Sequence, residues 1–401
     1  KQNKYKALLS LDGGVFRGVI QIEMLAHVET AIKQVMIDQQ LVSYSSPSDF
    51  DVLLSDYFDL VAGTSVGSYL AAYLTSNGGD MHEMYPAQFT ARPGSAAGAL
   101  QMFNILAGVF ASAPPSNPRN WTRDSVALGD VVSRTLTKFF GNRSMHSYAQ
   151  FTTAFLATWT DYSDFTMAYN FVNPKLAMGG YVRPAGPTQD QDEIRLNRNF
   201  YLWQCARGSG SDTELLAPFN ATTTPDTPAV DATSILVADG CFGAQEPAAM
   251  AIPHMLQLLK VPLDRLAVLS FGTTVLGANL NYTQLMARIP NVWQFGWQCE
   301  TNLAISVTAH RAMFTAIGRP DAYVRVDRMF QTNQPCPDVD EPTCLAWKKA
   351  VRESTPGANG ENYPIFKAIG AALFKQYETD VKAFIKKFVV LNGCNHLDAT
   401  V

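Results

Sequence analysis

One stretch, residues 56–70 (DYFDLVAGTSVGSYL), constrains the fold of this chain more than any other. Its apolar start predicts a buried strand, and the small and apolar residues 66–74 predict a helix directly after a sharp turn. Gly63 and Gly67 flank Ser65 in a G-x-S-x-G pattern, which between a strand and a helix lifts a serine hydroxyl out of the backbone. We therefore predict that Ser65 is a nucleophile, although the same residues also suit an ordinary loop with a helix-capping serine.

Composition and charge exclude several classes of protein. With 401 residues, of which 47% are hydrophobic, the chain can bury a large core in one α/β domain, or in one domain with a smaller attachment. The formal net charge is -4, and the sequence has no long runs of like charge, so it does not indicate a basic surface that would bind nucleic acid. No window offers about eighteen uninterrupted apolar residues, so we expect no transmembrane span.

Strands and helices alternate at the start of the chain. Residues 5–11 predict a first strand that ends in a glycine turn, and residues 19–36 repeat apolar side chains at helical spacing. With the stretch 56–74 they form a β-α-β-α opening, which is typical of a parallel sheet. Further buried strands are expected at 233–238 and 266–274. We therefore expect an α/β fold with a mainly parallel central sheet flanked by helices.

The rest of the chain is less regular. The segment 179–231 is rich in Pro, Gly, Thr and Asp, and we expect it to be loop with one ordered element near 197–206. Periodicity predicts helices at 126–140, 247–259 and 365–389, a strand with a hairpin or edge pair at 151–171, and a strand at 323–326.

Residues 81–124 interrupt the alternation of strands and helices. Proline-containing segments on both sides bracket the apolar stretch 96–111, which is broken only by Gln101 and Asn104. The stretch is either a buried helix or a mobile lid or interfacial segment over the site.

Cysteines and glycosylation sequons point to a compartment. All six cysteines lie in the second half of the chain and allow up to three disulfides, with no spacing that suggests zinc. Candidate N-glycosylation sites occur at Asn120, Asn142, Asn220 and Asn281. Together these features favour a secreted protein or one in the vacuolar or endomembrane lumen.

Three strand ends carry small or reactive residues, at 12–14, at 63–67 and at Asp239 with Gly240. Ligands bind beyond the carboxyl ends of parallel strands, so the three turns converge if these strands are parallel neighbours. Asp239 can then act as a general base toward Ser65, because apolar surroundings raise the pKa of a carboxylate.

The first glycine turn supplies backbone donors for an oxyanion. Gly13, Gly14 and Val15 offer consecutive N–H groups in a nest-like turn, and Arg17 could support the same charge. Two ordinary interpretations remain open, since Asp239-Gly240 is also a common turn and glycines after a strand can serve only to let a helix pack closely.

These three stretches, in this order, resemble the patatin-like phospholipase family. Its pattern is a D-G-G-G-x-[RK]-G oxyanion turn, a G-x-S-x-G elbow and a D-G-[GA] aspartate. The likeness extends to residues 56–68, to 235–250 and to 269–274, and it covers most of the segment 5–275. The resemblance implies a three-layer α/β/α fold and no metal or organic cofactor.

Carried over residue by residue, the resemblance places the family's nucleophile on Ser65 and its general base on Asp239. The oxyanion donors fall on Gly13, Gly14 and Val15. The other motif positions that match are Asp12, Arg17, Gly18, Gly63, Gly67 and Gly240.

Four positions depart from the family pattern. The third glycine is Val15, and if its φ must be positive a β-branched residue is strained there. Ser68 replaces the glycine after the elbow, Cys241 follows Asp239-Gly240, and Glu246 stands where an Asn usually precedes the proline. Beyond residue 279 the likeness is faint.

The family uses a Ser-Asp dyad, whereas a Ser-Asp-His triad would need a histidine after Asp239. His254, His310 and His396 satisfy that order, so a soluble carboxylesterase with a triad is one alternative. A storage or defence glycoprotein with weak esterase activity is another, which Val15 keeps open.

We therefore expect a lipid acyl hydrolase of the phospholipase A or galactolipase type. The partner would be a phospholipid or galactolipid substrate at a membrane or micelle interface. We expect a catalytic domain at 1–278, with 81–124 as a candidate lid, and a helical, cysteine-bearing part at 279–401 packed on the same domain. The sequence does not indicate an oligomeric state.

Overall fold

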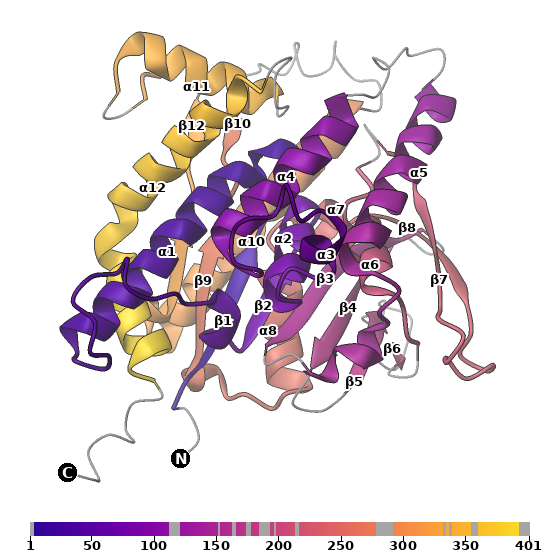
Figure 1. Ribbon diagram of the computed structural model, residues 1–401, viewed down its shortest axis with the longest axis horizontal. Helices are drawn as coiled ribbons and strands as arrows, with labels where there is room; N and C mark the ends of the chain where they lie inside the picture. The colour runs from indigo at the N-terminus through magenta and orange to yellow at the C-terminus, as the bar shows by residue number, and fades with distance from the viewer. Residues whose placement is uncertain are drawn as a thin grey trace.

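The computed structural model describes residues 4–111, 121–150, 153–162, 166–173, 178–183, 193–195, 198–212, 216–277, 292–331, 334–336, 339–353 and 360–392. A large twisted sheet runs through the molecule, and helices cover it (Figure 1). The expected α/β fold with flanking helices is confirmed, and its sheet is mixed.

Within the described residues, ten strands form the main sheet, and two form a small separate one. The main strands are β1 (Lys6–Leu11), β2 (Leu60–Gly63), β3 (Ala154–Asp161), β4 (Thr166–Asn173), β5 (Met178–Arg183), β6 (Glu193–Arg195), β7 (Phe219–Thr222), β8 (Ser234–Asp239), β9 (Leu266–Phe271) and β11 (Tyr323–Val326). The small sheet pairs β10 (Val275–Gly277) with β12 (Met329–Gln331).

Strand direction divides the main sheet into two halves. In the order β11-β9-β1-β2-β3, every neighbouring pair is parallel. Beyond β3, the strands β4, β5 and β6 continue the sheet with antiparallel pairing, and β8 pairs antiparallel with β3 and with β7. The condition under which the sequence predicts converging turns, parallel neighbouring strands, therefore holds for β1 and β2 but not for β8, which ends in Asp239.

The longer helices are α1 (Gly18–Asp38), α2 (Val66–Thr75), α4 (Ala96–Ala111), α5 (Trp121–Phe140), α6 (Leu202–Ser209), α8 (Ala248–Gln257), α10 (Val292–Ala316), α11 (Glu341–Glu353) and α12 (Asn362–Phe384). The short ones are α3 (Met81–Met84), α7 (Cys241–Ala244), the 3-10 turns η1 (Val15–Arg17), η2 (Leu54–Asp56), η3 (Met145–Gln150), η5 (Leu263–Arg265) and η6 (Pro320–Ala322), and the π-helical end of α12, η7 (Ile385–Val390).

Helices α1, α4 and α12 lie on the face of the sheet that Figure 1 turns toward the viewer, with α1 packed between the other two. Helix α10 contacts α7, which in turn contacts α8 and β3. The apolar stretch 96–111 is helix α4, and its side chains Met102, Phe103 and Leu106 are buried in the core. Its burial matches the buried-helix interpretation, while a lid movement stays a prediction.

The segment 179–231 contains more regular structure than the sequence indicates. Strand β5 begins it, β7 pairs with β8, and α6 lies where the single ordered element was expected. Helix α6 begins with a capping box, in which the Tyr201 and Gln204 side chains each bond the other residue's backbone. Sequence patterns do not predict these short elements, because turn-forming residues lie between them. Each element is stabilised by tertiary pairing more than by its own propensity.

Two disulfides join the described cysteines, Cys241 with Cys299 and Cys336 with Cys344, while Cys205 is a buried free thiol. Cys394 lies outside the described residues. Of the candidate glycosylation sites, Asn142 and Asn220 are exposed, and Asn120 and Asn281 lie outside the described residues. Over the part of the chain that the structure describes, we find no helix with the length and hydrophobicity of a membrane span.

Candidate active site

Ser65 stands at the turn between β2 and α2, and its backbone is strained. Its φ of 53° and ψ of -126° lie where side-chain-bearing residues rarely occur. A side chain at Gly63 would overlap the carbonyl of Gly67, and one at Gly67 would overlap the carbonyl of Leu11. The two glycines therefore allow the close approach of strand and helix that a nucleophile elbow requires.

The elbow is held from helix α6 as well. The Ser65 N–H donates to the Ser209 hydroxyl over 2.9 Å, and the Ser68 hydroxyl donates to the Ser65 carbonyl over 2.6 Å. Ser68 takes the place of the family's glycine, and its hydroxyl fixes the elbow carbonyl. Ser209 lies in the segment that the sequence predicts to be mostly loop, so sequence reasoning did not single it out.

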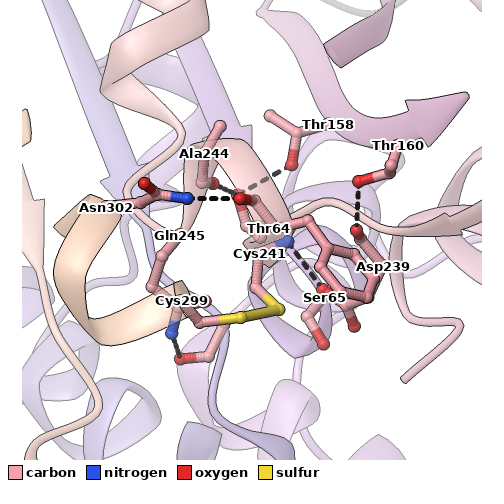
Figure 2. Close-up of a disulfide and its surroundings, with 12 residues drawn as sticks. Thr64, Ser65, Thr158, Thr160, Asp239, Cys241, Ala244, Gln245, Cys299 and Asn302 are labelled. Carbon is pink, nitrogen blue, oxygen red and sulfur yellow. Dashed lines mark hydrogen bonds between the residues drawn. A yellow bond between two sulfur atoms is a disulfide. The ribbon is translucent and has the colours of Figure 1, made fainter. Parts of the chain in front are cut away.

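Asp239 reaches Ser65 because β2 and β8 share one edge of β3. Strand β2 pairs with the first half of β3, where Gly63 is opposite Ala157, and β8 pairs with the second half, where Asp239 is opposite Trp159. The strands run in opposite directions, so their carboxyl ends face each other. The Ser65 hydroxyl and the Asp239 carboxylate meet across this junction, where the hydroxyl lowers the pKa of the carboxyl group, and Figure 2 shows both residues there.

Backbone contacts on both sides fix Asp239. The Cys241 N–H donates to Asp239 Oδ1 over 2.9 Å, and the Thr160 hydroxyl donates to the Asp239 carbonyl over 2.7 Å. A side chain at Gly240 would overlap the Thr158 hydroxyl, so the aspartate turn also lies tightly against β3. The carboxylate is therefore held in one orientation.

The surroundings of Asp239 disfavour its charge. Its pKa is raised to about 8, chiefly by burial and also by the nearby charge of Asp212. Hydrogen bonds from Ser65 and Cys241 and the charge of Arg207 oppose the rise. A carboxylate with a pKa near neutrality is suited to accept and return a proton during turnover.

The glycine turn after β1 lies against the elbow. A Cβ atom built on Gly13 would be 3.0 Å from Ser65 Cβ. Among the residues that the structure describes, the Gly14, Val15 and Val66 N–H groups have no hydrogen-bond acceptor, while the Gly13 N–H donates weakly to the Gln245 carbonyl over 3.4 Å. Gly14 and Val15 of this turn, with Val66 at the start of α2, therefore offer the available donors.

Val15 has a φ of 50°, in the region that glycine adopts most readily. The structure thus contains the strained β-branched residue that the departure from the family's glycine implies. A non-glycine residue there costs on the order of 1–2 kcal/mol. The surrounding hydrogen bonds must therefore hold the turn in place.

Side chains from distant segments supply those bonds. The Gly13 carbonyl accepts hydrogen bonds from the Gln245 amide over 2.9 Å and from the Thr273 hydroxyl over 2.6 Å. Arg17 donates to the carbonyls of Gly14 and Thr274. Its guanidinium therefore fixes the backbone of the turn, and its support of an oxyanion stays a prediction.

Asp12 is turned away from the elbow into a buried ion pair. Arg325 of β11 binds its carboxylate with two hydrogen bonds of 2.8 and 2.5 Å, and also binds Asp327. Burial opposes the charge of Arg325, but Asp12 and Asp327 together hold its pKa well above its usual value. Sequence reasoning missed Arg325, because no local pattern indicates a partner so far along the chain.

An apolar pocket opens beside Ser65. Most of its wall comes from η1, α2 and α4, and Asp212 is its acidic residue. Its lining residues are Val15, Phe16, Ser65, Val66, Tyr69, Phe103, Leu106, Phe110, Gly210, Asp212 and Leu216. At Gly18, a side chain would press on the Phe103 ring of the same wall. The described residues contain no cluster of three or more His, Cys, Asp or Glu side chains that could hold a metal ion.

The two described histidines that follow Asp239 are engaged elsewhere. His254 is buried, packs its ring on Phe171 at 4.5 Å, and has its pKa lowered to about 4 by burial. His310 contacts Glu246 over 3.0 Å. His396 lies outside the described residues. The contacts of His254 and His310 give neither of them the place of a triad base.

Comparison with known families shows to which family the chain belongs. The family model described as "Patatin-like phospholipase" matches residues 9–229, more than half of the chain. The chain belongs to the patatin-like phospholipase family. This match includes the glycine turn and the Ser65 elbow of the patatin-like fold, and ends before Asp239.

Similar plant proteins carry the patatin name. The chain is 34% identical over 88 residues to patatin-like protein 4 of Arabidopsis thaliana, covering 22% of this chain and 19% of that protein. It is 33% identical over 76 residues to patatin group M-2 of Solanum tuberosum, covering 19% and 17%. It is 26% identical over 276 residues to the probable inactive patatin-like protein 9 of Arabidopsis thaliana, covering 66% and 59%. The chain thus spans less than two thirds of each of these relatives.

Proposed function

We propose that this protein is a lipid acyl hydrolase of the phospholipase A or galactolipase type, which uses Ser65 and Asp239 as a catalytic dyad. The observation that carries the proposal is the meeting of the strained Ser65 with the buried Asp239 carboxyl group, beside a turn whose Gly14 and Val15 N–H groups have no acceptor among the described residues. Family membership supports ester hydrolysis, because the family model is named for phospholipases.

The reaction follows from these positions. Ser65 Oγ attacks the carbonyl carbon of an acyl ester while its proton moves to the Asp239 carboxylate. The Gly14 and Val15 N–H groups stabilise the negative oxygen that forms. Asp239 then gives the proton to the departing alcohol, which leaves an acyl group on Ser65. A water molecule, deprotonated by Asp239, attacks this ester, and the fatty acid departs as Ser65 recovers its proton.

The pocket supports an acyl chain as the part of the substrate that binds beside Ser65. Its walls are almost wholly apolar, and Phe103, Leu106 and Phe110 of α4 line it together with Ser65. Burial of methylene groups against such walls gives binding energy without a polar partner. In this proposal, the head group and the membrane or micelle interface lie outside the pocket.

Labelling with a fluorophosphonate serine probe tests the nucleophile. We expect the probe to label the wild type, to leave Ser65→Ala unlabelled, and to label Asp239→Asn far more slowly. Mass spectrometry of the products from mixed phospholipid and galactolipid micelles then identifies the substrate. Equal labelling of Ser65→Ala and the wild type would overturn the proposal.

A protein with vestigial activity is the second candidate, and two observations favour it. Val15 strains the oxyanion turn, and one similar protein is named probable inactive. A storage or defence role would then retain the fold without efficient turnover. The same labelling experiment distinguishes the two, since a chain with vestigial activity reacts slowly even as the wild type.

We further propose that the protein is secreted or resides in the vacuolar or endomembrane lumen. Two disulfides and the exposed sequon residues Asn142 and Asn220 support this location. Removal of N-glycans by an amidase should lower the mass of protein from its native source. An unchanged mass together with reduced cysteines would contradict the proposal.

A further inference from the structure

One face of α10 lies along the segment that follows Asp239. Residues 299, 302, 306 and 310 recur every three or four positions, so they share one side of the helix. Helix α7 and the residues up to Glu246 lie against that side. The α10 clamp, defined here as Cys299, Asn302, Ser306 and His310, therefore contacts the segment 241–246.

Every member of the α10 clamp makes a specific contact with this segment. Cys299 forms a disulfide with Cys241, and the Asn302 amide donates to the carbonyl of Phe242. Ser306 donates to Glu246 Oε2 over 2.8 Å, and His310 Nδ1 lies 3.0 Å from the same oxygen. Figure 2 shows the disulfide near Ser65 and Asp239, and Asn302 farther along toward Ala244.

Glu246 anchors the far end of the segment. Its other oxygen accepts hydrogen bonds from Ser270 over 2.9 Å and from Tyr323 over 2.6 Å. The glutamate is fully buried, so four partners replace its hydration. This is the position where the family pattern has an Asn, and the longer carboxylate reaches both α10 and the parallel half of the sheet.

The clamped segment joins the two halves of the candidate site. At its start, the Cys241 N–H orients the Asp239 carboxylate. At its other end, Gln245 exchanges hydrogen bonds with the Gly13 backbone in the oxyanion turn. A displacement of α7 would therefore move the base and the donors relative to Ser65.

We propose that Cys241 and Cys299 are positioning residues for the reaction of Ser65, because their disulfide fixes α7 and with it the orientation of the Asp239 carboxylate. This inference rests on the proposed function for its kinetic consequence. Its structural consequence, the fixed carboxylate, does not depend on turnover.

Two effects follow when the disulfide is removed. Turnover falls because a mobile carboxylate accepts the Ser65 proton less often, while substrate binding in the apolar pocket changes little. In addition, the Cys241 N–H bond lowers the pKa of Asp239, so its weakening should raise that pKa further. A disulfide that contributed only to stability would move neither kcat nor this pKa in the folded protein.

The experiment compares two double variants. Cys241→Ala with Cys299→Ala removes the disulfide next to Asp239, and Cys336→Ala with Cys344→Ala removes the other one as a matched control. We expect the first variant to lose at least tenfold in kcat with KM changed less than threefold, and the control to keep both. Equal kcat values for the two variants would overturn the inference.

Direct titration of Asp239 by carboxyl carbon NMR separates this inference from the proposed function. With Asp239→Asn to assign the signal, we expect a raised midpoint only in the variant that lacks Cys241 and Cys299. If the wild type hydrolyses no ester, the proposed function fails while this titration still tests the positioning. Identical midpoints in the wild type and both double variants contradict it.

Reduction of the native protein covers the case in which the first double variant does not fold. A dithiol such as dithiothreitol converts the disulfide into two thiols and is itself oxidised to a cyclic disulfide. Alkylation and peptide mass spectrometry show which pair has opened. We expect kcat to fall as the Cys241–Cys299 disulfide is reduced. A fall in kcat that accompanies reduction of Cys336–Cys344 instead would contradict the inference.

Discussion

The carboxylate of Asp212 opposes the ionisation of Asp239 from the pocket beside Ser65. Burial is the larger cause, and together they raise the pKa of Asp239 to about 8. Asp212 stands at the end of the α6 region, just before a segment outside the described residues. Its own burial and the charge of the less buried Asp212 thus raise the proton affinity of the candidate base.

Activity should therefore rise with pH as Asp239 loses its proton. We expect kcat/KM of the wild type to increase through a midpoint near the pKa of about 8. Asp212→Asn removes one opposing charge, so the midpoint should move to lower pH. The measurement is the pH profile with a soluble ester, with Asp380→Asn on the exposed side of α12 as control. If the midpoint of the pH profile is the same in Asp212→Asn as in the wild type, this prediction is wrong.

The buried Glu246 should make the fold sensitive to acid. Burial opposes its charge, but His310, Arg325 and Tyr323 hold its pKa at about 2, below the ordinary value of 4.5. A depressed pKa contributes stability that is present above pH 4.5 and is lost as the pH falls toward 2. The loss is at most about 1.4 kcal/mol per pH unit.

Glu246→Gln removes this contribution. The variant should be less stable than the wild type at pH 6 by about 1–3 kcal/mol, and the difference should shrink by pH 3. Urea unfolding at the two pH values measures it, and the exposed Glu83→Gln serves as the control. A difference that stays constant between these pH values argues against the role of the charge.

The strain at Val15 predicts how the oxyanion turn responds to substitution. Val15→Gly relieves a cost of roughly 1–2 kcal/mol, which the freedom of glycine in the unfolded chain offsets by roughly 0.5–1 kcal/mol. We expect kcat to hold or rise and the unfolding free energy to change little. Val15→Ala is the comparison, because it also shortens the side chain but keeps Cβ at positive φ. A tenfold lower kcat for Val15→Gly than for Val15→Ala would reject the strain argument.

Phe110 tests whether the pocket holds an acyl chain. Its ring lines the pocket and packs edge-on against Phe16 at 5.1 Å. Phe110→Ala should lower kcat/KM for long-chain esters by about tenfold and change that for acetyl esters little, since only the long chain reaches the ring. Phe50→Ala removes a similarly half-buried ring stacked on Tyr44 and should leave both values unchanged. If Phe110→Ala affects long and short esters equally, the acyl chain does not bind against this ring.

The elbow was predictable from the sequence because its requirements are local. Gly63 and Gly67 are needed where strand and helix backbones nearly touch, and Ser65 lies between them. The parallel strands β1, β2 and β9 were predictable as well, since strands buried on both faces are continuous apolar runs. The direction of β8 was not predictable, because a short buried strand has the same composition in either orientation.

The sequence by itself determined the chemistry that this protein can offer: a serine on a strained turn, an aspartate at a strand end and a turn with backbone donors. Only the tertiary structure decided how these parts meet. Ser65 and Asp239 face each other because β2 and β8 end head to head on β3. Arg325, Glu246 and the Cys241–Cys299 disulfide hold the neighbouring turns, and their contacts join residues far apart in the chain. Such contacts depend on packing and register, which no local pattern of residues records.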